Sequence, residues 1–291
     1  PVVKPALDAE KAIAALPPAP PVKRPKDSGK KDNYPIEQAV TGRTKADGSL
    51  IRALGLKIGR IVLDPGHGGS DQGTAGPTGL LEKDLVLDVA MRLGDLLEKQ
   101  LDAEVIYTRK DDAFVSPERR AQIANELKGD LFISIHANSA PQNYVAGVET
   151  FYTSFTNSPE ALELAARENA TSESNVRDLV SLMEKIATNT KINESREFAA
   201  RIQVAMLRTA QPGPNRDRGV KRAPFIVLIG AQMPAILSEI AFLSNPKEEE
   251  RLKKPETRQK IAEALLEGIA SYAASLGRST QVAAAGGSGL D

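Results

Sequence analysis

The chain has no cysteine among its 291 residues. This absence excludes a disulfide framework and a zinc site made of thiolates, so any metal ion would have to be held by histidine, carboxylate and water. Aromatic residues make up only 4% of the chain, and 38 basic residues balance 38 acidic ones. A nucleic-acid-binding protein normally shows a basic field and stacking aromatic side chains, so we expect no nucleic-acid partner.

Long apolar runs are missing as well. No stretch of about 18 apolar residues is present, so the sequence predicts no membrane span. The chain starts at Pro1 and shows no charged and then apolar leader, which predicts a processed or trimmed chain without its export signal. The balanced charge gives no indication of oligomerisation, so a monomer is the default expectation.

Both ends of the chain differ in character from its middle. Residues 1–58 contain the segment PPAPPVKRPKDSGKKDNYP, which is typical of a mostly disordered linker rich in proline and lysine. The alternative is a strap that packs on the domain or binds a partner. Within this region, residues 49–56 have helical spacing and are predicted to form the first ordered element. Residues 278–291 end in AAAGGSGLD and are predicted to be a disordered tail, which leaves 59–277 as the folded domain.

Strand-like and helix-like patterns alternate through the middle of the chain. The pattern predicts strands at 60–64, 104–108, 131–136, 148–152, 225–229 and 235–239, and helices at 83–101, 117–127, 194–208 and 255–276. Ser116 suits the cap of the second helix and Pro117 its first turn. Such alternation predicts a three-layer αβα domain around a mostly parallel sheet.

A segment of different character, 153–194, interrupts this alternation. It is predicted to contain two helices, 158–169 and 176–189, joined by the polar stretch TSESN. One interpretation is a surface helical hairpin that only fills space. The alternative is a lid, because the insertion leaves from the strand that follows the His136 loop and could fold over a site there.

The chain has only two histidines, and both follow a predicted strand. His67 lies in RIVLDPGHGG and His136 follows LFISI. Ligands bind at the carboxyl ends of strands in open α/β sheets, so the two histidines suggest one shared site. A catalytic zinc needs three nitrogen or oxygen ligands and leaves a fourth position to water. Glu82, at the start of a predicted helix, could turn back as a third ligand, although alone it would be an ordinary helix-start residue.

Glu239 is the best candidate for a general base. It lies in AILSEIAFLSN, where an apolar strand runs into a polar loop. A buried carboxylate there would be costly without a partner, and a water molecule activated by a metal would be such a partner. The alternative is a core glutamate paired with an arginine, and Arg109 is a candidate for that arginine.

Six motifs in order resemble the zinc-dependent N-acetylmuramoyl-L-alanine amidases of bacterial cell-wall turnover. They are IVLDPGHGGSDQGT, GLLEKDLVLDVA, FISIHANS, GVETFY, RGVKRAPFIVL and PAILSEIAFLSNPKEEERL, and the resemblance covers about 54–276. It implies a mixed six-stranded sheet, one Zn²⁺ ion held by His67, Glu82 and His136, and Glu239 as the catalytic carboxylate. The implied reaction is hydrolysis of the amide between N-acetylmuramic acid and L-alanine in peptidoglycan. Asn138 and Arg222 are further candidates for substrate contacts or supporting groups.

The same resemblance sharpens the interpretation of the insertion. Periplasmic cell-division amidases of this family carry an extra helical segment at this place, which occludes the zinc until an activator moves it. The resemblance implies that a glutamate of the segment contacts the zinc, with Glu168 as first candidate and Glu173 and Glu184 behind it. It also implies an upstream wall-targeting module and an activator with a coiled coil and a degenerate peptidase-like domain, for which the apolar stripe of the LVSLMEKIA helix is the expected contact. The implied compartment is the periplasm of a Gram-negative-type bacterium.

Two other classes of function compete with this interpretation. The first is a zinc hydrolase of another cell-wall specificity, a peptidase or a deacetylase; the absence of an HExxH motif disfavours the thermolysin-like peptidases. The second is a non-catalytic peptidoglycan-binding regulator. The presence of all four candidates for metal and base, His67, Glu82, His136 and Glu239, disfavours a regulator.

Overall fold

The computed structural model describes residues 58–172, 191–210 and 215–285. Residues 1–57, which hold most of the predicted linker and its helical segment at 49–56, lie outside the described residues, as does the predicted helix at 176–189. Ile58, the last residue of the predicted linker, is only 3% exposed and packs in the core. Within the described ranges, no helix has both the length and the apolar character needed to cross a membrane.

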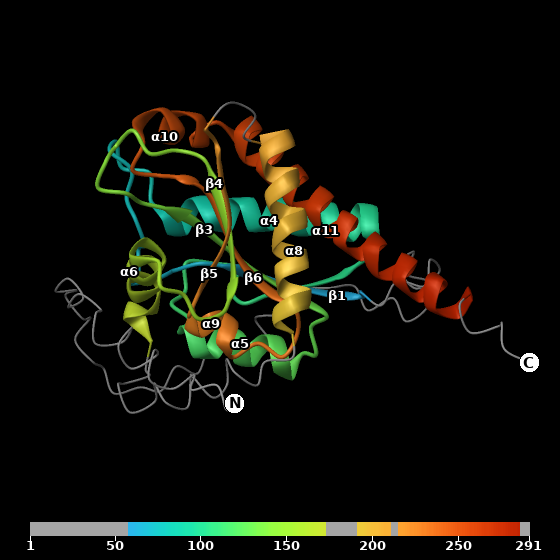
Figure 1. The fold of residues 1–291 in the computed structure, drawn as a ribbon. Helices are drawn as coiled ribbons and strands as arrows, with labels where there is room; N and C mark the ends of the chain where they lie inside the picture. The colour runs from blue at the N-terminus through green and yellow to red at the C-terminus, as the bar shows by residue number, and fades with distance from the viewer. Residues whose placement is uncertain (1–57, 173–190, 211–214, 286–291) are drawn as a thin grey trace, which may run out of the picture.

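The centre of the molecule is one six-stranded sheet in the order β2-β1-β3-β6-β4-β5 (Figure 1). Every neighbouring pair is parallel except β4 and β6, which run antiparallel. The predicted fold, a mixed and mostly parallel sheet, is confirmed. The strands are β1 (Arg60–Pro65), β2 (Glu104–Tyr107), β3 (Leu131–Asn138), β4 (Val148–Thr153), β5 (Asp217–Ala223) and β6 (Ala235–Phe242).

Helices cover both faces of this sheet, which gives the predicted three layers (Figure 1). On one face lie α4 (Glu82–Leu101), α8 (Ile192–Ala205) and α11 (Pro255–Ala285). On the other lie α5 (Pro117–Glu126), α9 (Ile226–Ile229) and the insertion helix α6 (Pro159–Glu168). Strand alternation separates two apolar clusters: Ile61 and Ile133 pack in the first cluster, and their neighbours Val62 and Phe132 pack in the second.

The first helix of the insertion matches its prediction at 158–169. The Ser158 hydroxyl accepts a hydrogen bond from the Ala161 N–H and caps α6, and Pro159 occupies the first turn. A 3-10 turn, η1 (Asn169–Thr171), follows directly and ends the described part of the insertion. The opening of the insertion is therefore an ordered helix that leaves from β4.

Three expectations about the C-terminal half are corrected. The predicted strand at 225–229 is the short helix α9, because a short apolar run that is buried on all sides has no period that separates strand from helix. The sixth strand is instead β5, DRGVKRA, a largely polar edge strand without the apolar alternation of a typical strand. A further helix, α10 (Pro246–Leu252), and the extension of α11 to Ala285 were not predicted, so the first part of the predicted disordered tail, 278–291, is helical.

Candidate metal centre

The predicted site lies at the carboxyl ends of β1, β3 and β6, which are parallel neighbours in the sheet. His67 follows β1 directly, His136 lies on β3, and Glu239 on β6 is the register partner of His136. The sheet therefore brings both histidines and the candidate base to one edge, as expected for an open α/β sheet.

The backbone at His67 adopts an unusual conformation. Its φ is 57°, in the left-handed region that residues other than glycine rarely occupy, and the next residues Gly68 and Gly69 also have positive φ. This turn aims the ring away from the strand. Because a carboxylate only accepts, His67 Nδ1–H donates to Asp71 Oδ2 over 2.9 Å, which leaves Nε2 to face the site. Asp71 was not predicted from the sequence, although its position four residues after His67 in HGGSD was the available signal.

His136 is buried, and the backbone beside it leaves little room. A Cβ atom on Gly66 would come within 2.4 Å of the imidazole atoms Cε1 and Nε2 of His136, so a glycine is required at this position. The two imidazole rings lie edge to face with centroids 4.8 Å apart. His136 Nδ1 then faces the same point as His67 Nε2.

Glu82 turns back toward the strand ends as predicted. It is the first residue of α4 and is 2% exposed. Its Oε2 accepts from the Thr74 N–H at 2.8 Å and its Oε1 from the Ala137 N–H at 2.9 Å. The same Oε1 lies 3.2 Å from both His67 Nε2 and His136 Nδ1.

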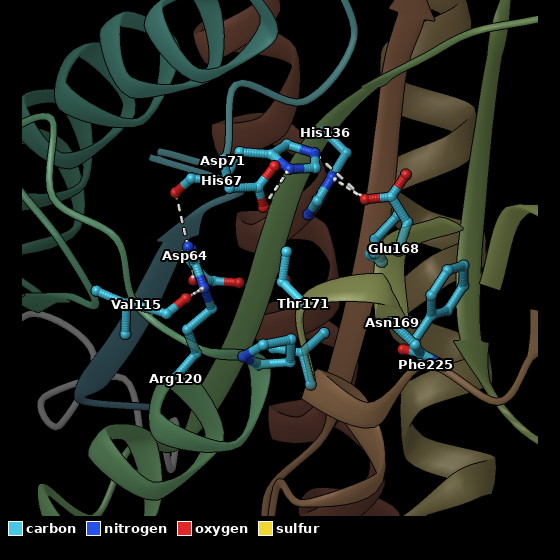
Figure 2. Close-up of a pocket in the computed structure, with 13 residues that line it drawn as sticks. Asp64, His67, Asp71, Val115, Arg120, His136, Glu168, Asn169, Thr171 and Phe225 are labelled. Atoms are coloured by element: carbon cyan, nitrogen blue, oxygen red, sulfur yellow. Dashed lines mark hydrogen bonds and ion pairs between the residues drawn. The ribbon is translucent and has the colours of Figure 1, made fainter. Parts of the chain in front are cut away.

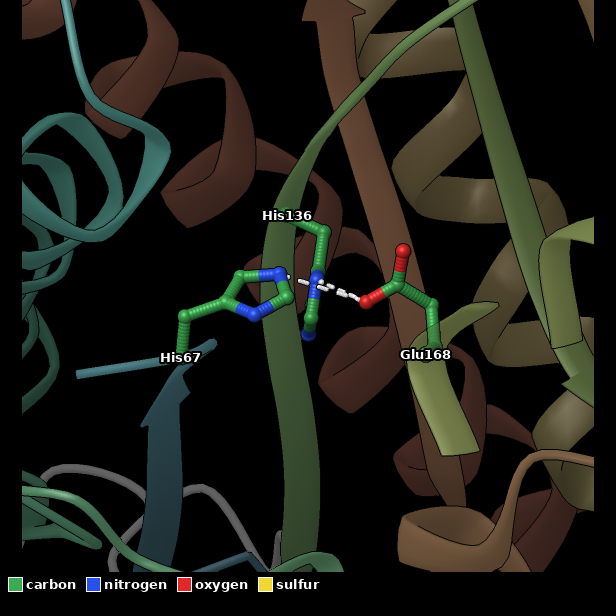
Figure 3. A group of neighbouring side chains, drawn as sticks. All are labelled: His67, His136 and Glu168. Atoms are coloured by element: carbon green, nitrogen blue, oxygen red, sulfur yellow. Dashed lines mark ion pairs between the residues drawn. The ribbon is translucent and has the colours of Figure 1, made fainter. Parts of the chain in front are cut away.

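Glu168 enters the site from the other side, at the end of α6. Its Oε2 lies 3.2 Å from His67 Nε2 and 3.1 Å from His136 Nδ1, and Figure 3 shows its carboxylate directed at both rings. His67, His136 and Glu168 offer ligand atoms within 4.8 Å of one another and could hold a metal ion. Glu82 is not in that group of three, yet its Oε1 is as close to each histidine nitrogen as Glu168 Oε2 is. We therefore treat all four residues as the candidate ligand set.

Three of these converging atoms are buried and make no hydrogen bond within the described chain: His67 Nε2, His136 Nδ1 and Glu168 Oε2. Buried polar atoms without partners are costly, and a bound cation would satisfy all three. Ligands held at 2.0–2.2 Å from a tetrahedral zinc lie about 3.3 Å apart, close to the 3.1–3.2 Å between the carboxylate oxygens and the histidine nitrogens. The donor set therefore fits a zinc ion.

The charges of the cluster shift each other's pKa values. Burial alone would lower the pKa of both histidines, but the carboxylates of Glu82 and Glu168 outweigh burial. They hold the pKa of His67 well above its ordinary value and raise the pKa of His136 to about 10. In turn, burial would raise the pKa of both carboxyls, but the histidines lower that of Glu82 to about 2 and hold that of Glu168 well below its ordinary range. Glu82 and Glu168 are thus both ionised, and their negative charges favour positive charge on the histidine side of the centre, carried either by protons or by a metal ion.

Glu239 differs from the other carboxylates of the site. It is fully buried, and neither of its oxygens has a hydrogen-bond partner among the described residues. Burial, reinforced by the negative charges of Glu168 and Glu82, holds the pKa of Glu239 well above its ordinary range. Arg109, the candidate for a structural partner, donates instead to the carbonyls of Pro65, Gly66, Lys83 and Asp111.

Comparison with known proteins gives this geometry its context. Residues 61–271 match the family model described as N-acetylmuramoyl-L-alanine amidase. The chain belongs to the N-acetylmuramoyl-L-alanine amidase family. It is 35% identical over 220 residues to the N-acetylmuramoyl-L-alanine amidase AmiC of Escherichia coli O6:H1, an alignment that covers 73% of this chain and 52% of AmiC. The chain thus spans about half the length of that relative.

Solved structures agree with this membership. An N-acetylmuramoyl-L-alanine amidase from Clostridium difficile 630 superposes with a TM-score of 0.58 at 31% identity, and covers 74% of this chain and 96% of its own. The CwlD amidase of Clostridioides difficile, solved in complex with the GerS lipoprotein, superposes with a TM-score of 0.58 at 26% identity, and covers 75% of this chain and 99% of its own. The fold described above is therefore the amidase fold.

A second polar network supports the loop that carries His67 in this member of the amidase family. Asp64, fully buried on β1, accepts hydrogen bonds from Thr108, Ser134 and Arg120. Arg120 also donates to the carbonyl of His67 at 2.6 Å. Burial alone would raise the pKa of Asp64, but Arg120 and the two hydroxyls hold it below its ordinary value. A small cavity beside the histidines, lined by Arg120 and Asp64 and closed by Asn169 and Thr171, separates this network from η1 (Figure 2).

The remaining predicted site residues have different positions. Asn138 is buried at the end of β3, where its side chain bonds to Glu149 and to Arg167 of α6. Arg222 lies exposed on β5, so its predicted role stays a prediction. Glu173 and Glu184, the reserve candidates for the contact that Glu168 makes, lie outside the described residues. Arg167 and Glu149 were not predicted, because no sequence motif marks a residue whose partner comes from a distant strand.

Proposed function

We propose that this chain is a zinc hydrolase that cleaves the amide between N-acetylmuramic acid and the L-alanine of the stem peptide in peptidoglycan. The observation that carries the proposal is the convergence of two histidine nitrogens and the carboxylates of Glu82 and Glu168 on one point. Beside them lies the buried carboxyl of Glu239, which makes no hydrogen bond among the described residues. Membership of the amidase family supports the choice of bond.

The proposed ligands of one Zn²⁺ ion are His67, Glu82 and His136, with Glu168 in the remaining position. Imidazole and carboxylate suit zinc, and in a chain without cysteine no thiolate competes for the ion. The chemistry that such an ion supplies is polarisation of the scissile carbonyl and a lower pKa, about 7, for a water molecule in its open position. Asp71 would keep the His67 ring in the tautomer that presents Nε2.

Glu239 would act as general base and then as general acid. Its raised pKa suits a group that accepts a proton from the attacking water and passes it to the departing L-alanine amine. Its place opposite His136 in the strand register supports a position beside the proposed ion. The buried position, without a structural partner, supports this role over that of a core glutamate.

We further propose that the resting protein is autoinhibited. Glu168 Oε2 lies within 3.2 Å of both histidine nitrogens, so its carboxylate would fill the position that water needs. Activation would require a partner that stabilises a conformation with the end of α6 displaced. An activator with a coiled coil and a degenerate peptidase-like domain is the partner proposed. The GerS complex of CwlD supports the view that an amidase of this family can work with a protein partner.

Cell separation is the biological setting we propose. Peptidoglycan would be reached in the periplasm, where an autoinhibited enzyme could be restricted to sites that hold its activator. The match to the N-acetylmuramoyl-L-alanine amidase AmiC of E. coli supports a role on peptidoglycan.

Release of soluble fragments from dye-labelled peptidoglycan tests the proposal. The preparations, all supplied with zinc, are the full chain, Glu168→Ala, and Glu168→Ala combined with Glu239→Gln; Glu163→Ala, an exposed residue of the same helix, is the matched control. We expect Glu168→Ala to release label faster than the full chain and Glu163→Ala, and Glu239→Gln to abolish release.

Mass spectrometry of the products separates the alternatives. Stem peptides that begin with free L-alanine support the amidase, whereas cleavage within the peptide or loss of acetate would show a peptidase or a deacetylase. Binding to peptidoglycan without release by any zinc-loaded preparation would overturn the enzymatic proposal in favour of a regulator. Full activity of the unmodified chain would overturn autoinhibition alone.

A further inference from the structure

The last two residues of α6 occupy two different parts of the site. Glu168 faces the histidines, and Arg167 beside it donates from Nη2 to Asn138 Oδ1 at 2.8 Å and from Nη1 to the Ser139 carbonyl at 3.3 Å. Asn138 is two residues after His136 on the same strand. The inhibitory segment therefore places an acceptor group at the metal position and donor groups immediately beside it.

The orientation of the Asn138 amide is fixed by chemistry. Its Nδ2 donates to Glu149 Oε1 at 2.6 Å, and a carboxylate can only accept. Its Oδ1 accepts from Arg167 and from the Ser139 N–H at 2.7 Å, and both of these groups can only donate. No flipped amide satisfies these partners, so Oδ1 must point toward Arg167.

Glu149 is itself held firmly in place. It is 3% exposed on β4, and its other oxygen, Oε2, accepts from Lys221 and Arg218 of β5. These two bonds come from β5 and not from α6, so the orientation of Asn138 that Glu149 imposes does not depend on α6. When Arg167 leaves, Oδ1 of Asn138 and the carbonyl of Ser139 remain as a preorganised pair of acceptors. The Arg167 side chain that covers them is 38% exposed, so its departure opens them toward solvent.

We propose that this acceptor pair binds amide N–H groups of the substrate. Glu149 is the positioning residue that keeps Asn138 in the accepting orientation. Arg167 takes the place of those N–H groups in the closed protein. The inference rests on the proposed function. A muramoyl peptide carries amide N–H groups next to the carbonyl that must reach the metal position. In the closed protein the carboxylate of Glu168 occupies that position and the donors of Arg167 lie beside it, so the two arrangements correspond. The N–H groups can come from the stem peptide or from the 2-acetamido group of the sugar.

Binding to a soluble muramoyl dipeptide measures this role apart from turnover. The background is the full zinc-loaded chain with Glu168→Ala, to open the site, and Glu239→Gln, to stop hydrolysis; the dissociation constant is measured by calorimetry. We expect Asn138→Ala to weaken binding about three- to tenfold, the effect of one or two neutral hydrogen bonds. The matched control is Asn125→Ala, which likewise removes a hydrogen-bonded amide. Asn125 bridges Gly230 O and Gln232 N–H near the start of β3, away from the site at the end of that strand.

Two ligand analogues identify the source of the N–H group. One replaces the N–H of the second peptide residue by an ester oxygen, and the other replaces the 2-acetamido N–H in the same way. The analogue that lacks the recognised group should bind Asn138→Ala and its parent equally well, whereas the other should keep the difference. Glu149→Gln allows the Asn138 amide to flip. It should weaken binding of the unmodified muramoyl dipeptide about two- to threefold and leave binding of the analogue without the recognised N–H unchanged.

The outcomes separate this inference from the proposed function. If the Glu168→Ala chain cleaves muramoyl peptides while Asn138→Ala binds them within twofold of its parent, the acceptor role is wrong and the amidase stands. Equal weakening of all three ligands by Asn138→Ala and Glu149→Gln, with reduced zinc content, would show a structural role and also overturn it. If the Glu168→Ala chain neither cleaves nor binds any muramoyl peptide, the inference is overturned together with the proposed function.

Discussion

The two sides of the metal centre are built in different ways. His67, His136 and Glu82 come from the ends of β1 and β3 and the start of α4, and each is tied to the core by hydrogen bonds or by close packing against the backbone. We call this side the frame. The other side, α6 and η1, is the cover. It buries only Ala161, Leu164 and Ala165 and attaches mainly through polar side chains at its end.

This difference has an energetic consequence. Removal of a charged group from the frame leaves its partner charge buried and unpaired, which costs several kcal/mol. A larger residue in place of a glycine of the frame would clash with the core. Release of the cover breaks the contact of Glu168 with the two histidines, where water can take its place, and otherwise exchanges a few hydrogen bonds for bonds to water at a net cost of about 1 kcal/mol each. The frame is therefore suited to hold an ion permanently, and the cover is suited to be displaced by a partner.

Loss of the carboxylate beneath the frame should have the largest effect. Asp64→Asn leaves the buried Arg120 without its anion and should lower the free energy of unfolding by about 3 kcal/mol at pH 7. Urea unfolding of the full chain measures this. Asp88→Asn, which breaks half-exposed pairs with Arg92 and Arg258, is the control and should cost less than about 1 kcal/mol.

The pH dependence of the same variant gives the sign of the linkage. The pKa of Asp64 is lower in the folded protein than in the unfolded chain, where it is about 4. The stabilisation by its charge is therefore complete above about pH 4 and is lost as the pH falls through the folded pKa. The difference between Asp64→Asn and the unmodified chain should shrink in acid; a constant difference from pH 7 to pH 3 would contradict the assignment.

A methyl group in the frame should have the next largest effect, on metal affinity rather than stability. In Gly66→Ala the new Cβ would meet the His136 ring at 2.4 Å, so the imidazole must move. We expect zinc affinity to fall about 100-fold, the upper range for disturbed support of a ligand. Competition with a chelator measures it.

Gly59→Ala provides the matched control for this change. Gly59 lies just before β1 and Gly66 just after it, and a Cβ on Gly59 would make only an ordinary contact of 3.6 Å with Asp130. Zinc affinity should be unchanged in this variant. Unchanged affinity in Gly66→Ala as well would mean that His136 does not ligate the ion.

The frame could be predicted from the sequence to a larger extent than the cover. His67, His136 and Glu82 lie at or beside the ends of regular elements whose apolar patterns are strong. Neighbouring parallel strands bring these ends together independently of the surface residues. Glu168 could be named only through the resemblance to a family, since its position depends on how a polar helix packs on a distant strand. Glu149 and Arg167 were missed for the same reason: their partners are fixed by tertiary structure. Asp71 is different, because its partner His67 is only four residues away and the spacing was visible in the sequence. The strand at β5 was missed because edge strands need no apolar alternation.

A change at the edge of the cover should have the smallest effect and should act in the opposite direction on activity. Asn169 joins η1 to the start of α9, with Nδ2 donating to the Pro224 carbonyl and Oδ1 accepting from the Ile226 N–H, both at 2.9 Å. Asn169→Ala removes both bonds and should favour the open conformation by about 1 kcal/mol, which corresponds to about fivefold faster hydrolysis of labelled peptidoglycan by the otherwise unmodified chain. Asn157→Ala, at an exposed position just before α6, should change nothing. In the Glu168→Ala background, Asn169→Ala should bring no further gain, because the position on the proposed ion is already free; an equal gain in both backgrounds would show that Asn169 acts on the frame and not on the cover.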